Sequence, residues 1–140
     1  GVENLTIEDL LTLRAGLEGT SGRNYGAWVN SEDWVAFALR RPMVATPGGR
    51  MIYSTGTTHI LGAVLAVATG KSLLAQARTV LGQPLGIEIP AWTQDPQGYL
   101  CVTKASSMVT RSFRPTGSTS QPKPAPDHLI RALIMAMAGS

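Results

Sequence analysis

The 140-residue sequence predicts a mainly α fold, on three observations. Thr6, Ser31 and Ser72 each precede a stretch with apolar side chains at helical spacing, as helix N-caps do. Residues 57–69 form a run that is apolar nearly all round and is closed by Gly70. The chain is 44% hydrophobic and 15% charged, which suits one modest domain with an apolar core.

The first predicted helix begins after Thr6, with Glu8 and Asp9 in its first turn, where acidic residues complement the helix dipole. Gly16 or Gly19 would end this helix. Its apolar face would consist of four leucines, namely Leu10, Leu11, Leu13 and Leu17.

A polar, glycine-bearing stretch over residues 19–30 separates this helix from the next. Ser31, followed by Glu32 and Asp33, is predicted to cap a second helix that Pro42 ends. The side chains that this helix can bury are Trp34, Val35, Phe37, Ala38 and Leu39.

A turn is predicted over residues 45–49, which read Ala-Thr-Pro-Gly-Gly. The run over residues 57–69 should then be a buried helix with Gly70 as its C′ residue. Because a buried histidine on such a helix usually has a hydrogen-bond partner, His59 is interpreted as a structural residue.

Ser72 is predicted to cap a last helix, ended by Gly82 and Pro84. Residues 90–98 follow as a loop with an Asp-Pro turn. The tryptophans Trp28, Trp34 and Trp92 are expected to pack in a core or interface, with the lining of a substrate cleft as the alternative.

Charge and composition exclude several classes of protein. The net charge of +3 belongs to residues 100–140, which carry five basic residues against one acidic, whereas residues 1–99 carry seven against eight. The basic residues of this tail are scattered among Pro, Ser and Thr, so we expect no nucleic-acid partner. No apolar run approaches the roughly 18 residues of a membrane span. With two histidines and one cysteine at no ligand spacing, we expect no metal site.

Five blocks of sequence occur in the order found in one known family. They are residues 5–17, Arg41-Pro42 with Pro47-Gly48-Gly49-Arg50, Tyr53-Ser54-Thr55-Gly56-Thr57-Thr58-His59-Ile60-Leu61, Ala68-Thr69-Gly70-Lys71-Ser72, and residues 81–87. Together they resemble the serine hydrolases grouped with class C β-lactamases and penicillin-binding proteins, which include D-alanyl carboxypeptidases and esterases. The resemblance covers residues 1–99. It implies a helical subdomain fragment of the β-lactamase/transpeptidase-like α/β fold, with the central sheet largely missing.

The resemblance implies a mechanism with three parts, of which this chain holds one. The tyrosine motif corresponds to Tyr53-Ser54-Thr55, which makes Tyr53 the catalytic group that accepts the serine proton and returns it to the leaving group. Thr55 occupies a substrate-binding position where the best-known enzymes have Asn, and it offers a hydroxyl instead of a planar amide. This difference favours an esterase, peptidase or amidase over a β-lactamase. The alternative is that Tyr53 only packs against or caps the next helix.

The other two parts are absent from the sequence. The Lys-Thr-Gly or His-x-Gly strand has no counterpart, and the Ser-x-x-Lys spacing occurs only at Ser120 and Lys123. We interpret that match as coincidence, because a proline follows the serine closely and the pair comes after the tyrosine motif instead of before it. We therefore expect an internal fragment that is inactive alone.

For the intact parent the resemblance implies hydrolysis of a small-molecule or peptide amide or ester through an acyl-serine intermediate, without a cofactor. It also implies an exported or periplasmic bacterial protein. Without its other half the fragment would leave the faces around Leu11, Val64 and Leu65 uncovered, and self-association is expected.

The tail over residues 100–140 has two interpretations. One is a basic Pro/Ser-rich linker leading to a short apolar helix, which would suit a non-catalytic interaction module for an acidic partner. The other is an out-of-frame segment: with permissible codons, a one-base displacement turns residues 134–139 into Tyr-Gly-Tyr-Gly-Trp, and residues 108–119 also give a family-like peptide. In that case the tail was not selected for folding and should be disordered.

Overall fold

The computed structural model describes residues 1–99, and the predictions for residues 100–140 lie outside that range. The described part confirms the mainly α prediction. Helices account for its regular structure, and its residues form no strand, although Leu17 and Met43 make an isolated antiparallel bridge. The helical elements in chain order are η1 (Val2–Asn4), α1 (Ile7–Leu11), η2 (Gly22–Asn24), α2 (Tyr25–Val29), α3 (Trp34–Leu39), α4 (Thr55–Thr69), α5 (Leu73–Ala77), η3 (Arg78–Gly82) and α6 (Gln83–Leu85).

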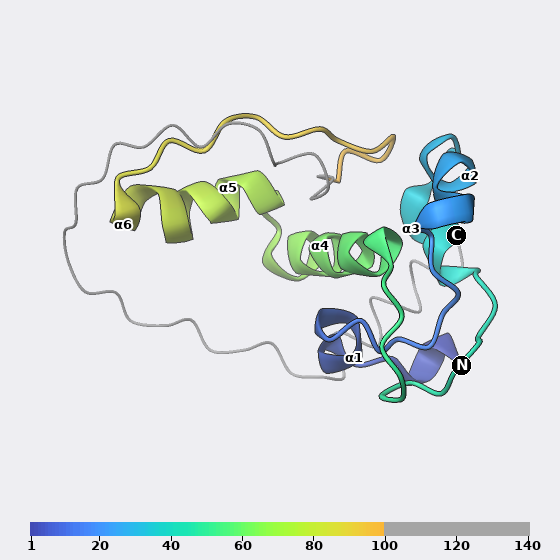
Figure 1. Cartoon of the computed structure of the whole chain (residues 1–140). Helices are drawn as coiled ribbons and strands as arrows, with labels where there is room; N and C mark the ends of the chain where they lie inside the picture. Colours follow the sequence, from blue (N-terminus) through green and yellow to red (C-terminus); the bar gives the residue numbers. More distant parts are fainter. Residues whose placement is uncertain (100–140) are drawn as a thin grey trace.

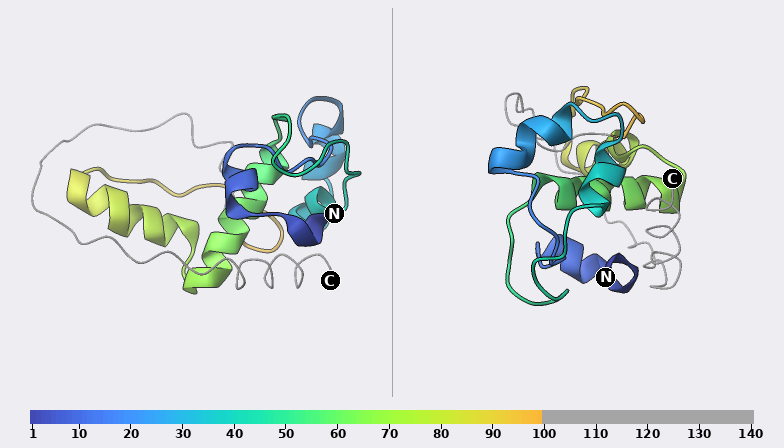
Figure 2. Two further views of the ribbon diagram at one scale, coloured as in Figure 1. Left: turned by 90° about the horizontal axis from the view of Figure 1, so that it is seen from below. Right: turned by 90° about the vertical axis from the view of Figure 1, so that its right-hand side faces the viewer.

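These elements divide into a body and an arm (Figure 1). The body, residues 1–64, packs α1 and α3 against the first half of α4. The arm, Leu73–Leu85, continues from α4 after a bend of 80° and extends away from the body, as the left view of Figure 2 shows. A return segment, residues 86–99, runs back along the arm to the body, where Asp95 contacts His59 of α4 and Gln97 donates to the Glu32 carbonyl just before α3 (Figure 1). The tyrosine motif lies in the body.

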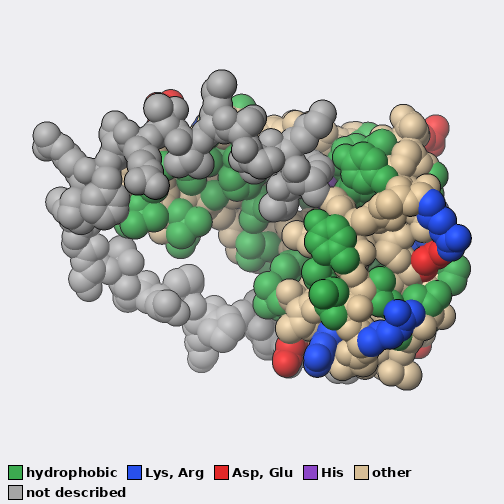
Figure 3. All heavy atoms as spheres, in the orientation of Figure 1, with side chains coloured by type: hydrophobic (Ala, Val, Ile, Leu, Met, Phe, Trp, Pro, Cys, Tyr) green, Lys and Arg blue, Asp and Glu red, His purple; other side chains and the backbone are tan. Residues whose placement is uncertain are grey.

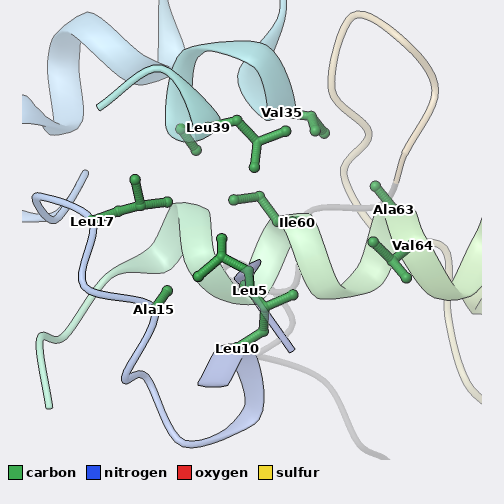
Figure 4. Close-up of a cluster of buried hydrophobic side chains, with 10 residues drawn as sticks. Leu5, Leu10, Ala15, Leu17, Val35, Leu39, Ile60, Ala63 and Val64 are labelled. Carbon is green, nitrogen blue, oxygen red and sulfur yellow. The ribbon is translucent and has the colours of Figure 1, made fainter. Parts of the chain in front are cut away.

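One cluster of apolar side chains forms the centre of the body (Figure 4). Ile60, Ala63 and Val64 project from α4 and are at most 2% exposed. The other members come from the N-terminal segment, α1 and α3, namely Leu5, Leu10, Ala15, Leu17, Val35, Ala38 and Leu39. Burial of a leucine, isoleucine or valine side chain contributes roughly 1.5–3 kcal/mol, so the contacts of Ile60 and Val64 hold α4 in place through its first half.

The helix α1 begins as predicted and ends early. Thr6 and Asp9 form a reciprocal capping box, in which the Asp9 amide donates to Thr6 Oγ1 and the Thr6 amide donates to Asp9 Oδ2. The prediction that the helix continues to Gly16 or Gly19 is wrong. The backbone of Leu13 adopts a left-handed conformation, with φ of 57°, which reverses the chain and aims the Leu13 carbonyl at the Ile52 amide, 2.8 Å away.

The stretch before α3 contains a helix that the sequence did not reveal. The helix α2 was not predicted because the stretch around it is rich in glycine and polar residues. Its Trp28 is fully buried against Trp34. The cap of α3 also differs from the prediction. Asp33, and not Ser31, accepts the hydrogen bond from the Ala36 amide, while the Ser31 hydroxyl donates to the Trp28 carbonyl.

The helix α4 runs from Thr55 to Thr69 and ends at Gly70, as predicted. The prediction that it is buried holds for its first half only. Val64 is 2% exposed, whereas Leu65 is 40% exposed and the last residues of the helix, 67–69, are exposed. The expectation that the fragment leaves apolar residues uncovered is therefore correct for Leu65 and wrong for Val64. It is also correct for Leu11, which is 64% exposed because α1 turns Leu10, on its other face, into the core.

The arm begins where predicted, with the Ser72 hydroxyl accepting a hydrogen bond from the Ala75 amide. The predicted end at Gly82 and Pro84 is wrong. A π-helical turn, η3, leads into α6, where Pro84 stands in the first turn and needs no amide partner, and the helix ends at Gly86. Among the described residues no single helix is long and apolar enough to cross a membrane. The bent pair of α4 and the arm reaches that length and hydropathy only when both are counted together.

Candidate active site

Tyr53 lies immediately before α4 and points into solvent. Its side chain is 68% exposed. Ser54, and not Tyr53, is the N-cap of α4, since the Thr57 amide donates to Ser54 Oγ at 3.3 Å. Among residues 1–99, Tyr53 therefore neither caps α4 nor packs in the core. A phenol held at the surface beside a helix N-terminus is accessible to a substrate.

Thr55 is buried beside Tyr53 and is paired with a second hydroxyl. The Thr55 amide donates to Ser21 Oγ at 3.1 Å, and the two hydroxyl oxygens lie 3.0 Å apart. Only one hydroxyl donates in that contact, so the hydrogen of the other is left to donate elsewhere. The Ser21–Thr55 pair therefore has one hydroxyl donor to offer.

The tyrosine motif is fastened to an anchoring segment, residues 19–21. Thr20 Oγ1 accepts a hydrogen bond from the Gly56 amide at 2.7 Å, and the Thr20 amide donates to Ser54 Oγ at 3.2 Å. The contact leaves no space for larger side chains: a Cβ on Gly56 would lie 2.7 Å from Thr20 Cγ2, and a Cβ on Gly19 would lie 2.8 Å from the Tyr53 carbonyl oxygen. Gly19 is required because two backbone segments meet there, and Gly56 because the Thr20 side chain packs directly against it.

His59 is fully buried one turn further along α4. Its Nε2 lies 2.7 Å from Asp95 Oδ2, and both side chains are at most 1% exposed. The ring packs against Trp28 and Trp34, with centroids 5.9 and 5.6 Å away. The interpretation of His59 as a buried, hydrogen-bonded residue is confirmed, and two of the three tryptophans pack as expected.

Asp95 ties the return segment to the body. Its Oδ1 accepts from the Tyr99 amide at 2.7 Å, while its own amide donates to the Tyr99 carbonyl at 2.8 Å. Sequence reasoning identified Asp95 only as a turn residue. It also missed Thr20 and Ser21, because two small hydroxyl residues in a polar stretch carry no signal of a partner more than thirty positions away.

The described residues contain no group of three or more metal-ligating side chains. A comparison with protein-family models matches residues 1–138 to the model described as Beta-lactamase. The chain belongs to the β-lactamase family. Its family-level chemistry is that of serine hydrolases that form an acyl-enzyme. The match includes residues 100–138, beyond the blocks on which the resemblance rested. No curated protein matches this chain by sequence.

Proposed function

We propose that this chain is the tyrosine-bearing part of a serine hydrolase that cleaves an amide or ester through an acyl-serine intermediate. The observation that carries the proposal is the exposed Tyr53 phenol, held next to the N-terminus of α4 in a chain of the β-lactamase family. The serine nucleophile and its lysine would come from another segment of the intact protein. The chain alone is then inactive.

Tyr53 would act as the general base that takes the serine proton and as the general acid that returns it to the leaving group. Such a group typically contributes about 10²- to 10⁴-fold to the rate. Thr55 would bind substrate through the hydroxyl donor that its pairing with Ser21 leaves over. Because one hydroxyl offers a single donor and no planar amide, the site suits a small-molecule or peptide ester or amide and is less suited to a β-lactam.

The test uses the protein expressed from its complete gene, treated with a fluorescent fluorophosphonate and separately with a fluorescent penicillin. We expect covalent labelling by the fluorophosphonate, lost when the serine of an upstream Ser-x-x-Lys is changed to alanine, and weaker labelling by the penicillin. A complete protein that is folded and is not labelled would contradict the proposal and favour a non-catalytic interaction module.

The 140-residue chain is the matched control. Its labelling is expected to be absent. Labelling that disappears in Ser120→Ala would show that Ser120 and Lys123 form a nucleophile of their own, and would overturn both our interpretation of that spacing as coincidence and the inactivity of the chain.

A further inference from the structure

The first turn of α4 is held by hydroxyl groups from two places: the N-cap residue next to it, and a segment more than thirty residues earlier in the chain. The first amides of a helix have no partner within it and must be satisfied from outside. Here the Thr57 amide donates to the N-cap Ser54, whereas the Gly56 amide donates to Thr20 and the Thr55 amide to Ser21. Thr20 and Ser21 precede their partners by 36 and 34 residues.

We infer that Thr20 and Ser21 are positioning residues for the proton transfer by Tyr53. This inference rests on the proposed function and names what fixes its geometry. A helix needs one cap to begin at Ser54, and Ser54 supplies it. The additional bonds from Thr20 and Ser21 fix where that helix start lies relative to the anchoring segment. They thereby fix the backbone from which the Tyr53 side chain projects.

Thr20 is the stronger of the two anchors. It is 1% exposed, so a Gly56 amide that lost Thr20 Oγ1 would be buried and unsatisfied. The anchoring segment and the tyrosine motif pack tightly at two points. Thr20 packs against Gly56, and Gly19 packs against the Tyr53 carbonyl oxygen. A shift of about 1 Å in a catalytic group can slow a reaction about 100-fold, so a tight anchor of this kind matters to a proton-transfer group.

A double-mutant cycle separates positioning from general stability. In the complete protein, Thr20→Val removes the acceptor and keeps the shape of the side chain. We expect it to slow acylation by a fluorophosphonate by about 10- to 100-fold in the presence of Tyr53. In a Tyr53→Phe background we expect no further loss, because the group being positioned is gone. An equal loss in both backgrounds would overturn the inference, since it would mean that Thr20 acts through the fold.

Two variants provide controls. Thr20→Ser keeps the hydroxyl and should restore most of the acylation rate. Thr12→Val removes an exposed hydroxyl that donates to the Glu8 carbonyl on α1, and it should leave acylation unchanged. If Thr20→Val acylates at the wild-type rate, the inference is overturned. The proposed function would still stand in that case, provided that the wild-type protein is labelled and that Tyr53→Phe loses the labelling.

Amide hydrogen exchange tests the same anchor without any turnover. In the 140-residue chain, Thr20→Val should speed exchange of the Gly56 amide about tenfold or more relative to Thr12→Val, because that amide loses its partner. If Thr20→Val unfolds the chain, Ser21→Ala provides the same measurement at the Thr55 amide from a partly exposed position. Unchanged exchange at both amides would overturn the anchoring. Faster exchange in a complete protein that cannot be labelled would uphold the anchoring and reject the catalytic role.

Discussion

The arm is richer in apolar side chains than the body but buries fewer of them. In the body, leucines and an isoleucine close a core in which Leu5 and Ile60 are inaccessible to solvent. In the arm, Val80 and Leu81 are more than half exposed. Figure 3 shows apolar side chains exposed along the arm as well as on the body, while most of the visible charged side chains lie over the body.

This difference shows that the part of the chain that positions the tyrosine motif is distinct from the part that exposes apolar surface. The body has its own core and holds the tyrosine motif with buried hydrogen bonds. The arm has only Gly82 buried among its thirteen residues, so most of its apolar side chains are poorly covered within the described part of the chain. The site geometry is therefore set by the body, and we expect perturbations there to have the larger effects.

The largest effect on stability is expected for Asp95→Ala. Its removal leaves the His59 Nε2 and the Tyr99 amide without their partner and frees the return segment, and each polar group left unsatisfied on burial costs about 1–3 kcal/mol. Urea unfolding followed by tryptophan fluorescence measures the change, because Trp28 and Trp34 flank the His59 ring. A loss below about 1 kcal/mol, as for a surface pair, would show that the return segment is not held by this contact.

Truncation of a leucine should distinguish the two regions. Leu10→Ala removes a core side chain that is 1% exposed and should lower the free energy of unfolding by about 2–5 kcal/mol. Leu81→Ala, at a position that is 54% exposed, should change it by no more than about 0.5 kcal/mol. Equal losses for the two variants, measured by the same urea titration, would refute the division into body and arm.

The exposed face of the arm should make the chain associate. Leu81→Lys places a charge on that face and is expected to shift the sedimentation of concentrated samples toward the monomer, with little change in unfolding. Leu11→Lys, on the exposed side of α1, is the matched control for an apolar-to-charged change in the body. If Leu11→Lys has the greater effect, association occurs through the body.

The smallest effect concerns Glu18. Hydrogen bonds from Arg23 and from Arg41 hold the pKa of the Glu18 carboxyl below its usual range. A carboxyl whose folded-state pKa is lowered adds stability above its ordinary pKa and loses it as the pH falls through the folded-state value. Glu18→Gln should therefore lower the melting temperature slightly at neutral pH and leave it unchanged at a pH below both pKa values. A difference of the same size at both values would mean that its charge is not responsible.

The sequence predicted the helices whose signals are local and missed what depends on distant partners. The caps at Thr6 and Ser72 and the end of α4 at Gly70 follow from residues within a few positions of one another. The early end of α1 depends on Leu13, whose left-handed backbone is compensated by the Ile52 amide far along the chain. The motif around Tyr53 was visible in the sequence, whereas its anchors were not, because a hydroxyl pair across 34 residues leaves no periodic pattern.

The central claim is that Tyr53 transfers the proton during acylation. It is tested most directly by the rate of fluorophosphonate acylation of the complete protein and of its Tyr53→Phe variant, with Tyr25→Phe as a control at an exposed tyrosine on α2. We predict that Tyr53→Phe acylates about 10²- to 10⁴-fold more slowly while Tyr25→Phe acylates at the wild-type rate. Acylation of Tyr53→Phe at the wild-type rate would contradict the claim.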